Sequence, residues 1–153
     1  MLRIKPIEGG QLVSTPLEMH FLNAIGLIMT YKCQVTCPHC VLHAGPHRKE
    51  EVSLKDAFDW INQISDYKNR NIKILSLTGG EPFYDLDKLN KISRFAKKKG
   101  LIISAVTNAF WADTYENSEK VLEKLDSIDA IAISTDKYHQ NYIPYDNVVN
   151  AVT

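Results

Sequence analysis

The amino-acid sequence predicts an α/β fold built around a parallel sheet. Two observations lead to this prediction. Four short apolar runs alternate with segments whose apolar residues recur at helical spacing, and polar or glycine-rich residues follow each run directly. Strands separated by helices pair in parallel through right-handed crossovers. The polar residues should therefore meet at one edge of the sheet, where α/β proteins place their functional sites.

The first predicted elements are a lead-in, a strand, a long loop and a helix. Residues 1–23 contain Gly9-Gly10 and are interpreted as an irregular lead-in or small hairpin. Residues 24–31 form a nearly continuous apolar run; a buried helix segment has the same pattern, but the short length favours a strand buried on both faces. A loop spans residues 32–52, and Ser53 then opens a helix in capping-box form. Its apolar stripe is Leu54, Ala57, Phe58, Ile61 and Ile64.

The remaining elements follow the same alternation. Further strands are predicted at residues 72–77, 101–107 and 129–134. A helix over residues 86–99 is expected to end at Gly100 as its C-cap. Ser118 is expected to cap a shorter helix that carries Val121, Leu122 and Leu125, and residues 145–152 suggest the start of a last helix.

Length and charge limit the classes of function. The chain has 153 residues, the length of one domain, and its 18 basic residues balance 18 acidic ones. No net field favours nucleic acid or an anionic membrane, so neither is expected as a partner. No signal peptide precedes residue 24, and no apolar run approaches the roughly 20 residues of a membrane helix, which predicts a cytoplasmic protein.

All three cysteines lie within eight consecutive positions, in the segment Cys33-Gln34-Val35-Thr36-Cys37-Pro38-His39-Cys40. An odd number of closely spaced cysteines suits a reducing compartment better than a disulfide framework. Converging thiolates select iron–sulfur clusters, zinc or Cu(I). One alternative is therefore a structural zinc site of the Cys3His type, with His39, His43 or His47 as the fourth ligand.

Four short motifs together resemble the radical S-adenosylmethionine (SAM) enzymes. They are the C-x3-C-x2-C spacing of the cysteines, Thr-Gly-Gly-Glu-Pro at residues 78–82, Thr-Asn-Ala at residues 107–109 and Ser-Thr-Asp at residues 134–136. The resemblance extends from about residue 24 to the end of the chain. It implies that residues 24–153 form the N-terminal part of a radical SAM core, a partial TIM-type barrel of parallel βα units that is truncated after about four units.

The resemblance also implies cofactors and roles for individual residues. Cys33, Cys37 and Cys40 are expected to bind a 4Fe–4S cluster whose remaining iron is open to SAM. Reductive cleavage of SAM then yields a 5′-deoxyadenosyl radical that abstracts hydrogen from the substrate. The expected SAM-binding residues are His39 near the adenine, Gly79, Gly80 and Glu81 near the ammonium group, and Asn108, Ser134 and Asp136 near the ribose or carboxylate. Glu81 equally fits a charge at a helix N-terminus.

Partners and substrate follow from the same resemblance. An electron donor such as a flavodoxin or ferredoxin is expected, together with a further segment or subunit that completes the barrel. A peptide or protein is the favoured substrate. Asp136 and His139 are the candidate catalytic residues. The alternative function is a non-catalytic metal-binding module that holds zinc.

Overall fold

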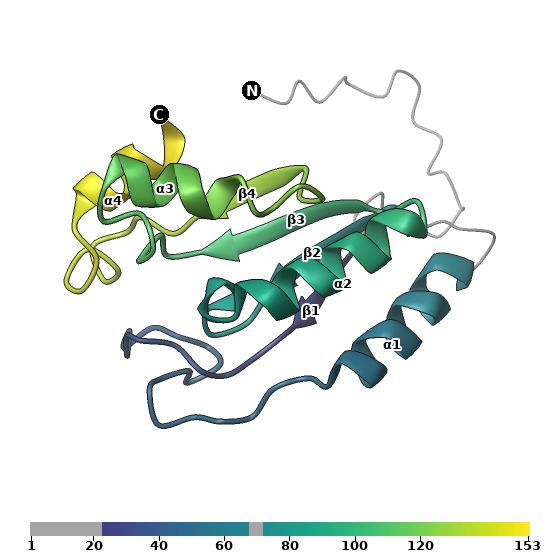
Figure 1. The fold of residues 1–153 in the computed structure, drawn as a ribbon. Helices are drawn as coiled ribbons and strands as arrows, with labels where there is room; N and C mark the ends of the chain where they lie inside the picture. The colour runs from purple at the N-terminus through teal and green to yellow at the C-terminus, as the bar shows by residue number, and fades with distance from the viewer. Residues whose placement is uncertain (1–22, 68–71) are drawn as a thin grey trace, which may run out of the picture.

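The computed structural model describes residues 23–67 and 72–153. The prediction for residues 1–23 therefore lies almost wholly outside the described residues. Four parallel strands form one sheet in the order β1-β2-β3-β4, as Figure 1 shows. The strands are β1 (Ala24–Ile28), β2 (Ile74–Thr78), β3 (Ile102–Thr107) and β4 (Ala130–Ile133). This confirms the α/β fold and its parallel pairing.

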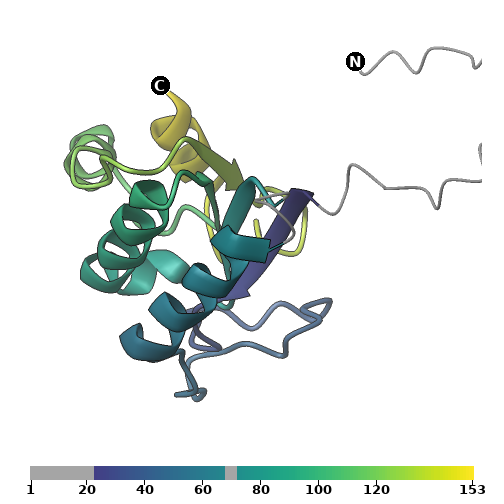
Figure 2. The same ribbon diagram turned by 90° about the vertical axis from the view of Figure 1, so that its right-hand side faces the viewer.

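Helices alternate with the strands along the chain. They are α1 (Leu54–Asp66), the short 3-10 helix η3 (Pro82–Tyr84), α2 (Leu86–Lys98), α3 (Tyr115–Leu122) and α4 (Tyr145–Val152). Figures 1 and 2 show α1 and α2 side by side over the same face. The main core lies between them and the strands, and it includes Ile61, Leu89 and Ile92 from the helices and Leu75, Leu77 and Ile103 from the strands.

The opposite face of the sheet is less covered. In β2, Leu75 and Leu77 are fully buried against the helices, whereas Ser76 and Thr78 on the other face are only half-buried. Only Leu27 is buried in β1. The prediction that the first strand is buried on both faces is wrong, because β1 is an edge strand of an open sheet in the described part of the chain.

Local hydrogen bonds explain where the helices begin and end. The Ser53 side chain accepts a bond from the backbone amide of Asp56, as the capping box predicts. The Asp85 side chain accepts one from the backbone amide of Lys88 at the start of α2, and Gly100 follows its end with a φ of +83°.

The third helix starts earlier than predicted. Thr114, not Ser118, is its N-cap, and the Thr114 hydroxyl accepts a bond from the backbone amide of Asn117. Ser118 lies inside the helix and is buried. Both residue types cap helices well, so the sequence alone did not distinguish them. Leu125 lies beyond the end of α3, and β2 begins two residues later than expected, at Ile74.

Backbone hydrogen bonds join the two ends of the long loop between β1 and α1. The backbone amide of Tyr31 donates to the carbonyl of Glu50 at 2.8 Å, and that of Val52 donates to the carbonyl of Met29 at 2.9 Å. These bonds close the base of the loop that carries the cysteines. No helix in the described residues is long and apolar enough to cross a membrane.

Candidate metal and cofactor site

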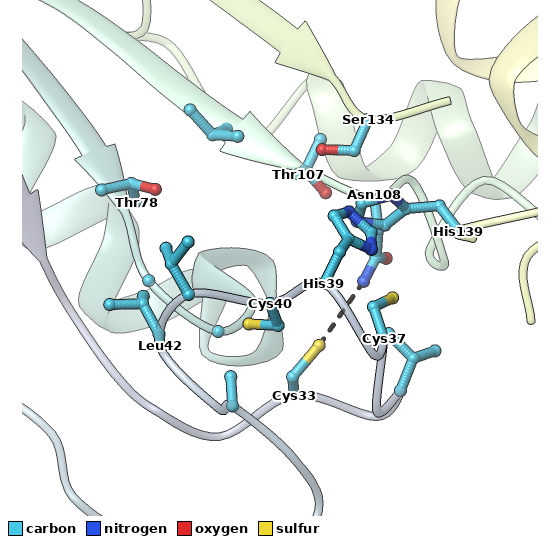
Figure 3. A pocket seen from close by; sticks show the side chains of 16 residues that line it. Cys33, Cys37, His39, Cys40, Leu42, Thr78, Thr107, Asn108, Ser134 and His139 are labelled. Atoms are coloured by element: carbon cyan, nitrogen blue, oxygen red, sulfur yellow. Dashed lines mark hydrogen bonds between the residues drawn. The ribbon is translucent and has the colours of Figure 1, made fainter. Parts of the chain in front are cut away.

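A cavity of about 310 Å³ lies at the carboxyl ends of the strands. It is lined from the cysteine loop after β1, the glycine turn after β2, and the segments that follow β3 and β4. Lining residues labelled in Figure 3 are Cys33, Cys37, His39, Cys40, Leu42, Thr78, Thr107, Asn108, Ser134 and His139; Gly79 and Gly80 also line the cavity. The prediction that the motifs meet at one edge of the sheet is thus confirmed for these residues.

The three cysteines are free thiols on one tightly turned loop. The backbone amide of Cys40 donates to the carbonyl of Cys37 at 3.0 Å, and that of His43 donates to the carbonyl of Cys40 at 3.0 Å. These turns bring all three residues to the cavity wall. Val35, Ala44 and Ile143 form a small apolar cluster around Cys33, which is itself only 5% exposed.

Burial raises the pKa of two of the three thiols. It raises the pKa of Cys33 to about 11, although a hydrogen bond from the Val35 backbone works in the opposite direction. Burial and the neighbouring Cys40 also raise the pKa of Cys37. The metal-free thiols of Cys33 and Cys37 therefore stay protonated at neutral pH. A bound metal centre must supply the positive charge that turns them into thiolates.

The glycine turn after β2 packs directly on the backbone that leads into the cysteine loop. The backbone amide of Gly80 donates to the carbonyl of Thr30 at 2.6 Å, and that of Glu81 donates to the carbonyl of Lys32 at 2.9 Å. A Cβ on Gly79 would lie 2.4 Å from the Thr30 carbonyl oxygen, and one on Gly80 would lie 2.2 Å from that of Lys32. Packing of chain against chain therefore already requires glycine at both positions.

Glu81 lies behind the cavity and does not line it. The side chain is 1% exposed and accepts hydrogen bonds from the Thr107 hydroxyl at 2.8 Å and from the backbone amides of Asn108 at 2.8 Å and Phe83 at 3.1 Å. Burial raises the pKa of Glu81 to about 7, against the effect of these three bonds. Glu81 is also the N-cap of η3, and its bonds to Thr107 and Asn108 join the end of β2 to the end of β3.

Asn108 connects this anchor to the cysteine loop. Its side-chain nitrogen lies 3.7 Å from the Cys33 sulfur, shown as the dashed line in Figure 3, and its side-chain oxygen accepts a bond from Gln34 at 2.8 Å. Sequence reasoning missed Gln34. The available signal was a polar, uncharged side chain directly beside Cys33.

A cluster of polar residues lies at the rim, where the segment after β4 meets the cysteine loop. His39 Nε2 lies 3.6 Å from an Asp136 carboxylate oxygen, and His139 Nδ1 lies 2.6 Å from the same oxygen. The His39 ring also packs on the Tyr138 ring, with 4.6 Å between centroids. Although desolvation opposes it, hydrogen bonds from the His139 ring and from the backbone amides of His139 and Tyr138 lower the pKa of Asp136 to about 2. Asp136 is therefore an anion at neutral pH.

Comparison of the sequence with models of known protein families identifies the family of this chain. The family model of the Radical SAM superfamily matches residues 27–152, which is most of the chain. The chain belongs to the radical SAM superfamily. The matched range includes the cysteine loop, the glycine turn and the segments after β3 and β4.

Two curated proteins are similar to this radical SAM chain. One is YydG of Bacillus subtilis (strain 168), whose name refers to peptide biosynthesis; it is 23% identical over 130 residues, which cover 84% of this chain and 40% of YydG. The other is MJ1227 of Methanocaldococcus jannaschii, named for activation of a glycyl-radical enzyme; it is 30% identical over 123 residues, which cover 77% of this chain and 47% of MJ1227. The chain thus spans less than half the length of both relatives.

The donor set of this site fits the cofactors of the radical SAM superfamily, a 4Fe–4S cluster and SAM. Thiolates are the ligands that iron–sulfur clusters take, and the chain contains only the three cysteines of the loop. The cavity volume lies within the range of small-molecule pockets, roughly 300–1,000 Å³. The described contacts of the His39 ring are with Asp136, Tyr138 and His139. They argue against His39 as the fourth ligand of a zinc site.

Proposed function

We propose that this chain carries the SAM-cleaving site of a radical SAM enzyme that acts on a peptide or protein. One observation carries the first half of the proposal. Three free cysteines, a glycine turn and the polar ends of β3 and β4 line a single cavity at the carboxyl edge of a parallel sheet. When bound there, a reduced 4Fe–4S cluster supplies the electron that cleaves SAM into methionine and a 5′-deoxyadenosyl radical.

The residues of the chain then have distinct tasks. Cys33, Cys37 and Cys40 hold the metal centre, and the apolar cluster of Val35, Ala44 and Ile143 restricts water around Cys33. The glycine turn offers backbone groups to the polar end of SAM, because Gly79 and Gly80 line the cavity beside the cysteines. Glu81 positions this turn and does not itself reach into the cavity.

The outer wall of the cavity suits the remainder of SAM and the approach of the substrate. Ser134 and Asn108 present hydrogen-bonding groups to the cavity, and His39 lies at its rim. We propose His139, which lines the cavity and is held by Asp136, as the group nearest to the bound substrate. Both residues stay candidates for a catalytic role.

A peptide or protein substrate is supported by the two relatives. One is named for peptide biosynthesis, and the other is named for activation of an enzyme, which is itself a protein. A flavodoxin or ferredoxin is the proposed electron donor, and the barrel is proposed to continue in a further segment or subunit beyond β4, whose outer edge is unpaired in the described residues.

Anaerobic reconstitution with iron and sulfide tests the site. The protein is expected to turn brown and, with SAM and dithionite, to release 5′-deoxyadenosine. Cys37→Ser should abolish both results, whereas Lys49→Ala, an exposed change on the same loop, should leave both intact. A colourless protein that binds one zinc tightly would instead establish the zinc module.

Isotope transfer tests the substrate class. Fully deuterated host-cell extract is separated into a polypeptide fraction and a small-metabolite fraction, and each is added to the active enzyme with unlabelled SAM. Deuterium in 5′-deoxyadenosine from the polypeptide fraction supports the proposal. Deuterium from the metabolite fraction alone overturns the peptide assignment and leaves the SAM-cleaving site standing.

A further inference from the structure

Asn108 has a buried side-chain amide, and a hydrogen bond of its backbone N–H fixes where that side chain begins. It follows β3 directly and is 4% exposed. Its backbone amide donates to Glu81 at 2.8 Å, and this bond fixes the start of the side chain. The side chain extends from there toward the cysteine loop, with Nδ2 3.7 Å from the Cys33 sulfur (Figure 3).

Two hydrogen bonds determine which end of the Asn108 amide faces the sulfur. The side-chain oxygen accepts a bond from the backbone amide of Phe110 at 3.1 Å and one from Gln34 Nε2 at 2.8 Å. A backbone N–H can only donate, so the oxygen must lie on the side of Phe110. Rotating the amide by 180° would place N–H against N–H there. The –NH₂ group therefore has to face Cys33.

Gln34 cannot supply the same donor. Its oxygen lies 3.7 Å from the Cys33 sulfur, an arrangement that suits a protonated thiol as donor. A metal-bound cysteine is a thiolate and only accepts hydrogen bonds. Gln34 Nε2 is already used by the Asn108 oxygen. Once Cys33 is a thiolate, two groups can donate a hydrogen bond to its sulfur among the described residues. One is the backbone N–H of Val35, and the other is the side-chain –NH₂ of Asn108.

We propose that Asn108 donates an N–H···S hydrogen bond to the Cys33 ligand of the cluster and thereby raises the reduction potential of the cluster. This inference rests on the proposed cluster site. It assigns to Asn108 a positioning and tuning role toward the metal centre, in addition to its place in the cavity wall.

The direction of the effect follows from charge. Reduction adds one negative charge to the cluster, so a donor to a ligating sulfur stabilises the reduced state more than the oxidised state. The apolar cluster of Val35, Ala44 and Ile143 around Cys33 lowers the local dielectric and strengthens the bond. Loss of the donor should therefore make the cluster harder to reduce.

A redox titration followed by EPR on the reconstituted full-length protein tests this role. Asn108→Ala removes the donor, and Asn108→Asp retains an acceptor for Phe110 and Gln34 while replacing the –NH₂ group with a carboxylate oxygen. We expect the ratio of reduced to oxidised cluster at a fixed potential to fall about tenfold in Asn108→Ala, which equals ~59 mV for a one-electron couple. The fall should be larger in Asn108→Asp.

Asn147→Ala is the matched control. Asn147 is a second buried amide that anchors the same segment, with Nδ2 3.1 Å from the carbonyl oxygen of Ala109, and its side-chain hydrogen bonds in the described part of the chain go to that segment and not to a cysteine. The midpoint potential of the cluster in the Asn147→Ala protein should equal that of the wild type. Unchanged potentials in both Asn108 variants overturn the inference, and so does an equal shift in Asn147→Ala, which would indicate packing of the segment.

A measurement on the unmodified sequence decides the matter if the Asn108 variants fail to assemble a cluster. Protein labelled with ¹⁵N only at asparagine side chains is reduced and studied by pulsed EPR. A ¹⁵N coupling to the cluster supports the bond, and its absence overturns it. A wild-type protein without any cluster would instead contradict the proposed function, so the two failures are distinguishable.

Discussion

Replacing Gly80 by alanine tests how the glycine turn supports the cysteine loop. The new Cβ would lie 2.2 Å from the carbonyl oxygen and 2.7 Å from the carbonyl carbon of Lys32. Both atoms belong to the backbone, so the clash cannot be relieved by rotating a side chain. The turn and residues 30–32 would have to move apart, and Lys32 directly precedes the first cysteine.

The cost can be built from the contacts that separate. The backbone bond from Gly80 to Thr30 (2.6 Å) and the one from Glu81 to Lys32 (2.9 Å) would both lengthen. Each net hydrogen bond contributes about 1 kcal/mol, and overpacking of a filled site costs about 1–3 kcal/mol. Because the two bonds lengthen without being fully lost, we take the lower end of this sum and expect Gly80→Ala to lower the free energy of unfolding by about 3 kcal/mol. With a urea slope of about 2 kcal/mol/M, the midpoint should fall by about 1.5 M.

Gly26→Ala is the matched control, because a Cβ at Gly26 on β1 would meet only the Thr78 methyl group at 3.8 Å, an ordinary contact. Its free energy of unfolding should change by less than about 0.5 kcal/mol. Urea unfolding gives the stabilities, and iron bound per chain after reconstitution reports the cysteine loop. Equal midpoints for the two variants would refute the argument that chain packing requires glycine at position 80.

Three other changes test the anchors around the cavity. Burial raises the pKa of Glu81 from its ordinary 4.5 to about 7, so the unfolded state loses this proton at a lower pH than the folded state. As the pH rises from 4.5 to about 7, the free energy of unfolding of the metal-free chain should therefore fall by about 3 kcal/mol. Glu81→Gln should lack that fall in urea unfolding at several pH values, and an unchanged slope would contradict the assignment. Thr107→Val should cost about 1–3 kcal/mol in the same assay, since it leaves the buried Trp111 indole N–H without its acceptor at 3.0 Å; a cost near zero would show that this bond is dispensable. Asp136→Ala should speed hydrogen exchange at the amides of Tyr138 and His139, which bond to its carboxylate at 2.9 and 3.2 Å, with exchange in β3 as the internal reference; equal rates in both proteins would mean that the carboxylate does not order this turn.

Much of the fold could be predicted because its signals are local. The alternation of apolar runs with helical stripes gave the order of elements, and the capping residue Ser53 placed the start of α1 correctly. The predicted start of α3 was wrong because Thr114 and Ser118 are both favoured capping residues and lie about one turn apart. The short helix η3 was missed, since its three residues carry no periodic pattern.

The candidate site was predictable in its ligands and less so in its supports. The spacing of Cys33, Cys37 and Cys40 is a property of consecutive residues and indicates a metal loop by itself. The network in which Glu81 holds Asn108, and Asn108 faces Cys33, joins residues 27 and 75 positions apart. Such contacts depend on how the strands pair in the sheet.

The sequence by itself determined the alternating elements, the three-thiolate loop and the arrival of four motifs at one edge of a parallel sheet, because periodicity and ligand spacing act over short stretches of chain. Only the tertiary structure decided that Glu81 is buried behind the cavity, that glycine is required by packing on residues 30–32, and that the Asn108 amide faces a cysteine sulfur. The physical reason is that these hydrogen bonds and steric contacts join atoms that follow different strands. Which atoms come together is set by the register of the sheet.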